Sequence, residues 1–144
     1  QRYVLGICFG HQVLAHCLGA KVKKNKLGWE LGSYKINLTE KGLKNKLFEG
    51  FSPQEIVYES HQDTVLELPD NIDILADSSK SNQSFSYNEK VFGVQFHPEF
   101  SKEVTRMLMD LRIAKGISVD SNDLLDSPKS HSVLKNFLNI AGVN

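Results

Sequence analysis

A cysteine flanked by glycines, set between an apolar run and a helical pattern, constrains the fold of this chain more than any other feature. The run Tyr3-Val4-Leu5 leads into Gly6-Ile7-Cys8-Phe9-Gly10-His11-Gln12, and apolar residues then recur at helical spacing up to Leu18. At a nucleophile elbow, a strand, a sharp turn that carries the nucleophile and a helix follow one another in this order. We therefore expect Cys8 at a strand-to-helix turn that its neighbouring glycines allow to be tight.

Length, charge and cysteine content exclude several classes of protein. With 144 residues, the chain has the length of one domain. Its 17 basic and 17 acidic residues balance, so no overall field attracts nucleic acid or an anionic membrane. No apolar run approaches the roughly 20 residues of a membrane helix, and two cysteines cannot form a disulfide framework. We expect a soluble, cytoplasmic protein without a nucleic-acid or membrane partner.

Alternating polar and apolar residues predict several strands between the cysteine and a second motif. Short strands are expected over residues 20–22, 34–38, 55–58 and 72–76. Asn88-Glu89 separates two further strand patterns and predicts a hairpin. The second strand of this hairpin runs directly into Phe96-His97-Pro98-Glu99.

Two helices are predicted after this motif. Ser101 can cap the first, and we expect its apolar stripe in the core: Val104, Met107, Leu108 and Leu111. Residues 118–130 are rich in Ser and Asp and are expected to form a linker or a loosely held loop. The final helix is expected over residues 132–141, docked by Leu134, Phe137, Leu138 and Ala141.

The cysteine and the later histidine have the chemistry of a nucleophile and its base. Unpaired amides at a helix start favour a thiolate at Cys8, and the backbone amide of Phe9 can donate to a developing oxyanion. Residues two apart in extended backbone point to the same side, so Glu99 can reach the imidazole of His97. Glu99 then fixes the tautomer, and the other ring nitrogen can take the thiol proton. Either motif alone is commonly only packing or a turn, whereas the two together favour catalysis.

The remaining cysteine and histidine residues near the elbow receive no catalytic role. Cys17 falls on the apolar face of the first helix, and we interpret it as packing. Cys8, His11, His16 and Cys17 spread around different faces of that helix, at a spacing that matches no usual zinc site. We therefore expect no metal and no redox cofactor.

The motifs resemble those of class I glutamine amidotransferases. The resemblance lies in the two stretches 6–12 and 93–99 and continues, in the same order, through Gly28-Trp29-Glu30-Leu31-Gly32 and Ser60-His61-Gln62-Asp63. It is greatest to the stand-alone branch that is GMP-synthase-like or γ-glutamyl-peptidase-like. In this family a cysteine attacks the side-chain amide of glutamine and forms a γ-glutamyl thioester with release of ammonia. The resemblance assigns Cys8 as nucleophile, His97 as base and acid, and Glu99 as the residue that orients the imidazole.

The same resemblance implies which residues bind the substrate. Gln12 and the stretch Ser60, His61, Gln62 and Asp63 would hold the α-amino and α-carboxylate groups of the glutamyl moiety. A charged amino acid needs several fixed donors and acceptors in exchange for its hydration. For His61 itself we prefer the interpretation as a loop histidine without a role in proton transfer.

The resemblance further implies an α/β fold with a doubly wound, mostly parallel, flavodoxin-like sheet. In the family several strands and helices precede the elbow, and one of their loops supplies the second oxyanion donor. Nothing in this sequence corresponds to them, and it begins with Gln1 rather than Met. We therefore expect residues 1–144 to be the C-terminal part of a single domain whose earlier elements were omitted. Loss of one oxyanion donor alone costs about 100-fold to 1000-fold in rate.

Several alternatives stay open within this interpretation. The substrate is free glutamine or a γ-glutamyl peptide, and no Gly-rich, Lys-containing nucleotide loop follows Glu99 to identify an ammonia acceptor. A separate synthase subunit would be compatible with this. A redox sensor would oxidise the elbow cysteine instead of acylating it, and a binding module would keep the glutamyl pocket without turnover. The presence of both His97 and Glu99 argues against the sensor.

Overall fold

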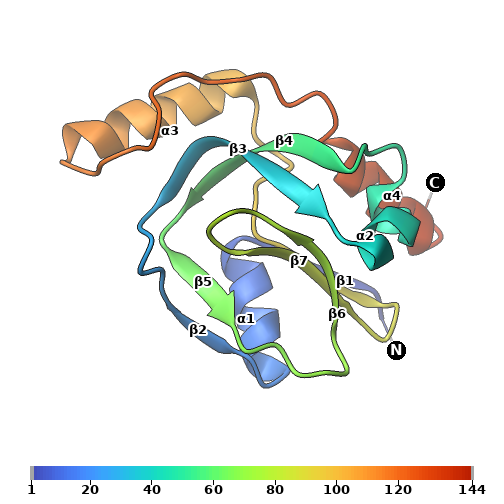
Figure 1. The fold of residues 1–144 in the computed structure, drawn as a ribbon. Helices are drawn as coiled ribbons and strands as arrows, with labels where there is room; N and C mark the ends of the chain where they lie inside the picture. Colours follow the sequence, from blue (N-terminus) through green and yellow to red (C-terminus); the bar gives the residue numbers. More distant parts are fainter. Residues whose placement is uncertain (1, 144) are drawn as a thin grey trace.

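A computed structural model describes residues 2–143 as an α/β fold built on a curled six-stranded sheet (Figure 1). The strands of this sheet lie in the order β1-β8-β7-β6-β3-β4. Their bounds are β1 Val4–Ile7, β3 Glu30–Leu38, β4 Gln54–His61, β6 Asp73–Asp77, β7 Asn82–Tyr87 and β8 Val91–Val94. A second, two-stranded sheet pairs β2 (Lys21–Lys24) with β5 (Asp63–Leu66).

The α/β class is confirmed, but the expectation of a mostly parallel sheet is wrong for the described residues. Only β1 and β8 pair in parallel there, with Ile7 opposite Val94, and the other pairs of the six-stranded sheet are antiparallel. A parallel crossover needs a dozen or more residues and usually a helix, whereas an antiparallel hairpin needs only a short turn. The only helices between β3 and β8 are the short α2 (Glu40–Lys44) and the 3₁₀ helix η1 (Lys46–Phe48). Hairpins therefore build this part of the sheet.

The hairpin between β7 and β8 forms where the sequence predicts it. Asn88 and Glu89 both adopt positive φ angles, 56° and 53°. They are the central residues of a β-turn closed by the Lys90 amide, which donates to the Tyr87 carbonyl (3.3 Å), within a three-residue connection between the paired residues Tyr87 and Val91. Positive φ at both central positions of a turn gives the twist that antiparallel strands require. The turn sets the register that places Ser84 opposite Val94, just before the segment that carries His97.

Helix α1 (Phe9–Cys17) packs against β1 and β8, but its buried face differs from the predicted one. His11 and Ala15 are fully buried, whereas Cys17 is exposed, so its interpretation as a packing residue is wrong. Periodicity places residues on a common stripe, but it does not say which stripe the sheet covers. In this helix the sheet covers the face that carries His11.

Helix α3 (Lys102–Ala114) runs along β3 and β4 at the top of Figure 1. Three residues of its predicted core stripe are exposed, at 42%, 63% and 57%: Val104, Met107 and Leu111. The residues that α3 does bury are Thr105 and Met109. Met109 fits there because Gly32 on β3 has no side chain, and a Cβ atom at Gly32 would lie 3.0 Å from the Met109 sulfur.

The last part of the chain wraps along the body of the fold. Residues 118–130, expected as a linker, contain no helix or strand, yet they are tied to the sheet. The Ser127 hydroxyl donates to the Ile56 carbonyl (2.6 Å), and the Tyr58 hydroxyl donates to the Leu125 carbonyl (2.9 Å). Helix α4 (Ser132–Ile140) then docks mainly through buried Val133 and Asn136, while Leu138, expected to dock, is 46% exposed.

Two apolar clusters fill the space on the two sides of the sheet. The larger contains Ile36, Leu47, Phe48, Val57, Leu75, Phe92, Val94 and Phe96, with Phe137 of α4 packed against it. The smaller joins Ala15 of α1 to Ala20, Val65, Ile72 and Phe85. None of the helices in residues 2–143 has the length and apolar character that crossing a membrane requires.

The contact between β1 and α1 depends on a residue without a side chain. A Cβ atom at Gly6 would lie 2.5 Å from the Gly10 carbonyl oxygen and 2.6 Å from a methyl group of Leu14. These distances are shorter than any real Cβ contact, so only glycine lets the helix start this close to the strand. Gly10, by contrast, has no atom within 4 Å of its would-be Cβ.

We predict that Gly6→Ala destabilises the protein by about 1–3 kcal/mol, the usual cost of overpacking. Gly10→Ala is the matched control, because it adds the same methyl group on α1 in open space. Since alanine is a better helix former than glycine, this variant should gain up to about 1 kcal/mol in free energy of unfolding. Urea unfolding of both variants measures the difference. Equal effects of the two substitutions would show that the close approach at Gly6 carries no energetic weight.

Candidate active site

Cys8 lies at the turn between β1 and α1 with an unusual backbone conformation. Its φ is 52° and its ψ is −100°, and its amide donates to the carbonyl of Val94 at the end of β8 (2.9 Å). Positive φ at a residue with a side chain is uncommon and often marks a functional turn. The half-buried thiol lies 3.9 Å from the Ser60 carbonyl oxygen and accepts from the Gln95 amide at 3.6 Å.

The side chain of Cys8 lies close enough to that of His97 to influence the pKa of the imidazole. Burial alone would lower the pKa of His97, but hydrogen bonds to Cys8 and to Glu99 outweigh it and raise this pKa to about 9. The Nδ1 atom of His97 lies 3.0 Å from Glu99 Oε2, which leaves Nε2 for the thiol. The imidazole also stacks on Phe100, with 4.0 Å between the ring centroids. Three groups therefore fix the orientation of this ring.

Glu99 is about half exposed, at 45% of its side chain, while the His97 side chain is 17% exposed. Burial raises the pKa of Glu99, but the hydrogen bond from His97 more than compensates and holds this pKa below its ordinary value. The carboxylate is therefore ionised at neutral pH and keeps a proton on His97 Nδ1. Such an arrangement allows His97 Nε2 to exchange a proton with the thiol.

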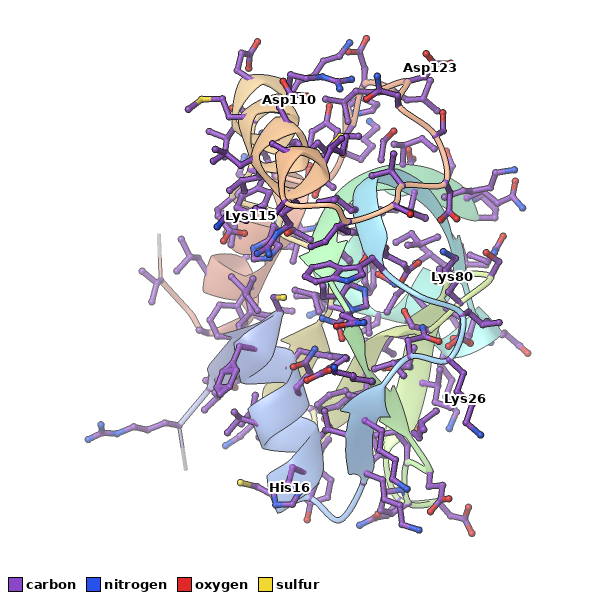
Figure 2. The ribbon with its side chains drawn as sticks, turned by 90° about the vertical axis from the view of Figure 1, so that its left-hand side faces the viewer. His16, Lys26, Lys80, Asp110, Lys115 and Asp123 are labelled. Carbon is purple, nitrogen blue, oxygen red and sulfur yellow. The ribbon has the colours of Figure 1, made fainter. Side chains whose placement is uncertain are left out.

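Phe9 is the first residue of α1, so its backbone amide has no acceptor within the helix. The amide immediately follows the thiol-bearing residue, which is where a nucleophile elbow offers an oxyanion donor. The phenyl ring of Phe9 is 69% exposed and takes no part in the core. Figure 2 shows α1 running from this end, beneath α3, down to His16 at its far end.

Gln12 and the stretch 60–63 meet beside the thiol. The side-chain amide of Gln12 donates to the Asp63 carbonyl (3.1 Å) and to the Gln95 side-chain oxygen (3.3 Å). The Gln62 carbonyl accepts from the Asn25 amide (2.8 Å), and the Ser60 hydroxyl accepts from Arg112. The structure thus places Gln12 of α1 against the junction of β4 and β5, where residues 60–63 lie.

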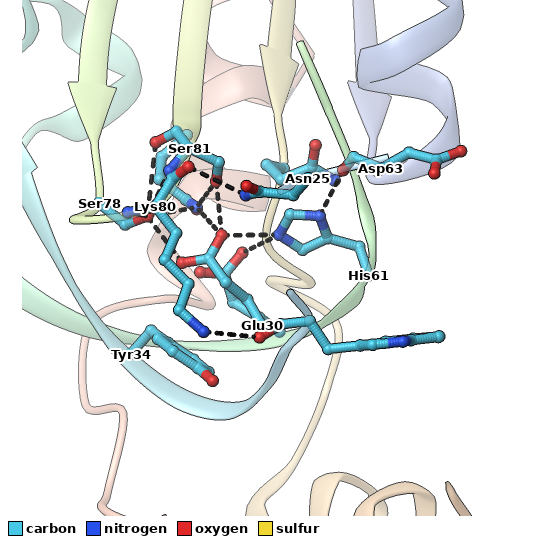
Figure 3. Close-up of polar contacts among 12 residues, drawn as sticks. Asn25, Glu30, Tyr34, His61, Asp63, Ser78, Lys80 and Ser81 are labelled. Carbon is cyan, nitrogen blue, oxygen red and sulfur yellow. Dashed lines mark hydrogen bonds and ion pairs between the residues drawn. The ribbon is translucent and has the colours of Figure 1, made fainter. Parts of the chain in front are cut away.

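His61 is not a loop histidine, contrary to our interpretation of the sequence. It is the last residue of β4, with a side chain only 3% exposed, and it contacts two buried carboxylates (Figure 3). Its Nε2 lies 2.8 Å from Glu30 and 3.2 Å from Glu59, and its Nδ1 lies 2.6 Å from the Asp63 carbonyl oxygen. Because both ring nitrogens face only acceptors, both carry protons, and His61 is an imidazolium.

The electrostatics of this buried cluster agree with its geometry. Burial lowers the pKa of His61, but the bonds to Glu30 and Glu59 raise it to about 10. Burial also opposes the ionisation of Glu30, yet His61, Ser78 and Ser81 hold its pKa below the ordinary value. Glu59 lacks the two serine donors, and burial together with repulsion from Glu30 raises its pKa to about 7.

The cluster supports the segment that borders the thiol. His61 holds the Asp63 carbonyl, to which Gln12 also donates, and Gln95 links Gln12 to Cys8. Among residues 2–143, Glu30, Glu59 and His61 are also the group whose side-chain atoms are close enough together to share a metal ion. The imidazolium already supplies a positive charge between the two carboxylates, and the group carries no net charge when Glu59 holds its proton.

His11 contributes packing rather than chemistry. Its ring is fully buried against Phe85, 5.0 Å between centroids, and burial lowers its pKa to about 3, so it is neutral. The ring fits only because Gly93 on β8 has no side chain, since a Cβ atom there would lie 2.5 Å from His11 Nδ1. Within the part of the chain that the structure describes, Cys8, His16 and Cys17 do not converge on it to form a ligand set.

Comparison with known proteins identifies the family to which this site belongs. The model of the family described as glutamine amidotransferase class-I matches residues 2–111. γ-Glutamyl peptidase 5 of Arabidopsis thaliana is 34% identical over 133 residues, which cover 90% of this chain and 52% of the peptidase. One subunit of the glutamine-hydrolysing GMP synthase of Saccharolobus solfataricus is 41% identical over 98 residues, 67% of this chain and 50% of that subunit.

A solved structure gives the same result for the fold. A glutamine amidotransferase from Thermotoga maritima superposes with a TM-score of 0.72 at 29% identity, over 95% of this chain and 61% of that protein. The chain therefore belongs to the class I glutamine amidotransferases. It spans about half the length of the curated relatives described above.

Sequence reasoning missed four residues that border or support the site. Gln95, Glu30, Glu59 and Arg112 had no assigned role, although Gln95 and Glu30 lie inside the family motifs. Glu59 alternates with His61 along one strand, and this spacing was the available signal that the two side chains share a face. No local signal links Arg112 to Ser60, because the contact joins α3 to β4.

We predict that Glu59 makes the stability of the protein fall as pH rises from about 5 to about 8. An acid whose pKa is higher in the folded than in the unfolded state binds its proton more tightly when folded, so stability present at low pH is lost as pH rises through about 7. Glu59→Gln removes this loss. Urea unfolding across that range should give a flatter dependence for the variant, and equal slopes for the two proteins would contradict the assignment.

Proposed function

We propose that this chain hydrolyses a γ-glutamyl amide bond through a thioester on Cys8. The observation that carries the proposal is an elbow cysteine with positive φ whose thiol acts on the pKa of His97, while Nδ1 of the same imidazole lies 3.0 Å from Glu99. Membership of the class I glutamine amidotransferases and the similarity to γ-glutamyl peptidase 5 and to the GMP synthase subunit support the same chemistry.

The proposed reaction has two halves with a shared base. The Cys8 thiol passes its proton to His97 as the sulfur attacks the γ-carbonyl carbon, and His97 gives this proton to the departing nitrogen, which leaves as ammonia or an amine. Water then attacks the thioester while His97 takes one of its protons, so that glutamate leaves and the thiol is restored. Glu99 keeps His97 in the required tautomer throughout, and the Phe9 amide stabilises the oxyanion in both halves.

The proposed substrate contacts follow from the positions of the remaining residues. The Ser60 carbonyl lies beside the thiol, and Gln12 and His61 both contact the Asp63 carbonyl. On this basis we assign the α-amino and α-carboxylate groups of the glutamyl moiety to Gln12, Ser60, His61, Gln62 and Asp63, His61 acting through the Asp63 carbonyl. The proposal needs no metal or redox cofactor. We also expect a cytoplasmic location and a synthase partner that takes up the ammonia. Residues 1–144 are proposed to be the C-terminal part of the catalytic domain.

Two substrates fit this proposal, and each has support among the relatives. Similarity to the GMP synthase subunit favours free glutamine, and similarity to γ-glutamyl peptidase 5 over 90% of the chain favours a γ-glutamyl peptide. Ammonia release from glutamine and amine release from γ-glutamyl peptides, measured on the protein in its full natural length, separate the two. The redox sensor is the competing function, and it requires reversible oxidation of Cys8 without either release.

We predict that a chloroketone analogue of glutamine labels Cys8 stoichiometrically and leaves Cys17 unlabelled. Cys17 is exposed and lies at the other end of α1 from Cys8, which makes it an internal control for general thiol reactivity. Peptide mass mapping after labelling reads out both sites. Equal labelling of both cysteines, or none at Cys8, would overturn the nucleophile assignment.

We predict that His97→Asn lowers kcat by about 100-fold to 10,000-fold, the usual contribution of a positioned acid–base group. Glu99→Gln should also lower kcat, because the amide cannot hold the ring in the same tautomer. His16→Asn is the control, since this exposed residue at the far end of α1 should leave kcat unchanged. Steady-state release of ammonia or amine gives the three values, and unchanged kcat in His97→Asn would refute the mechanism.

A further inference from the structure

The guanidinium of Arg112, near the end of α3, is held in place by two separate parts of the fold. Its Nε atom donates to the Ser60 hydroxyl at 3.1 Å, and its central carbon lies 4.8 Å from the centroid of the Trp29 ring. Ser60 belongs to β4 and Trp29 to the loop before β3. A guanidinium that stacks on an indole and donates to a fixed hydroxyl keeps little freedom to rotate.

The outer edge of this guanidinium is unoccupied. Within residues 2–143, neither of its two terminal nitrogens makes a hydrogen bond or an ion pair. Arg106, on the same helix, differs in this respect, since its terminal nitrogens donate to the side chain and the carbonyl of Asn122, at 3.0 and 2.6 Å. A planar edge with free N–H groups matches the two oxygens of a carboxylate. Arg112 therefore offers a fixed carboxylate-binding fork.

Ser60 joins this fork to the candidate nucleophile. Its hydroxyl accepts from Arg112, and its carbonyl oxygen lies 3.9 Å from the Cys8 sulfur. The acidic residue Asp120, which lines the same hollow as Trp29, does not compete for the arginine, because it is bound by Lys80 and by the Tyr34 hydroxyl. Lys80 in turn donates to the Trp29 carbonyl and fixes the loop that carries the indole (3.0 Å).

We propose that Arg112 binds a carboxylate of the γ-glutamyl substrate, with Trp29 as its platform, and so determines which amides the site accepts. This inference rests on the proposed function. The carboxylate has two sources: the α-carboxylate of the glutamyl group, present in every such substrate, and the C-terminal carboxylate of a γ-glutamyl peptide. Arg112 uses the same chemistry for either, and the choice decides whether glutamine or a peptide is favoured.

Affinity measurements on a protein that cannot turn over test this assignment. In the full natural protein with Cys8→Ser, isothermal titration would use three ligands: L-glutamine, a γ-glutamyl dipeptide with a free C-terminal carboxylate, and the same dipeptide as its C-terminal amide. Arg112→Gln should weaken binding by roughly 10-fold to 100-fold, the loss expected for hydrogen bonds to a charged group. Arg112→Lys should recover only part of this, because a lysine keeps the charge but not the fork.

The pattern across ligands identifies the carboxylate. Weaker binding of all three ligands assigns Arg112 to the α-carboxylate, and weaker binding of the free-acid dipeptide alone assigns it to the peptide end. Arg106→Gln is the matched control, a neutralised arginine on the same helix with partners of its own, and should change affinity by less than about 3-fold. Equal losses in both variants, or unchanged affinity in Arg112→Gln for every ligand, would overturn the proposal.

Turnover by the protein that retains Cys8 separates this inference from the proposed function. If the protein releases ammonia or amine but Arg112→Gln does not change ligand affinity, only the proposed role of Arg112 is refuted. If neither glutamine nor γ-glutamyl peptides yield ammonia or amine, the proposed hydrolysis is refuted. The titrations then still decide whether Arg112 binds the carboxylate.

Discussion

The parallel pairing of β1 with β8 is the interaction on which the rest of the site depends. It sets Ile7 opposite Val94, so the chain leaves both strands at the same edge of the sheet, and the Cys8 amide is tied to the Val94 carbonyl. Cys8 directly follows β1, and His97 lies three positions after the end of β8, so the thiol and the imidazole come together at this edge. The positive φ of Cys8 and the close approach of α1 at Gly6 are consequences of turning the chain so sharply at this edge.

Two histidine–carboxylate groups lie near the thiol and differ in exposure. His97 and Glu99 are partly exposed, so protons and solvent can reach them. His61, Glu30 and Glu59 are buried, and they hold the Asp63 carbonyl rather than the thiol. A buried imidazolium between two carboxylates is costly to dismantle, because removal of one partner leaves an uncompensated charge. The first group suits proton transfer, and the second suits the fixing of a binding segment.

The sequence predicts the local parts of this structure well and the distant parts poorly. The elbow at Cys8, the turn at Asn88 and the reach of Glu99 to His97 depend on neighbouring residues, and all three are present in the structure. Other features depend on which elements pack together. They are the direction of the strands, the covered faces of α1 and α3, and the contacts of Glu59 with His61 and of Arg112 with Ser60. Hydrophobic periodicity carries no information about that choice, and an alternating polar strand does not reveal that its polar side is buried.

The most direct test of the account is the pH dependence of Cys8 alkylation by iodoacetamide, compared between the wild-type protein and His97→Asn, with Cys17→Ser in both to leave one thiol. If the imidazole interacts with the thiol, loss of the His97 proton near pH 9 adds a step to the wild-type rate beyond the titration that any thiol gives, and the curve of the variant differs in shape because it lacks that step. Two superimposable curves would mean that sulfur and imidazole do not interact in solution, which would contradict the account at its centre.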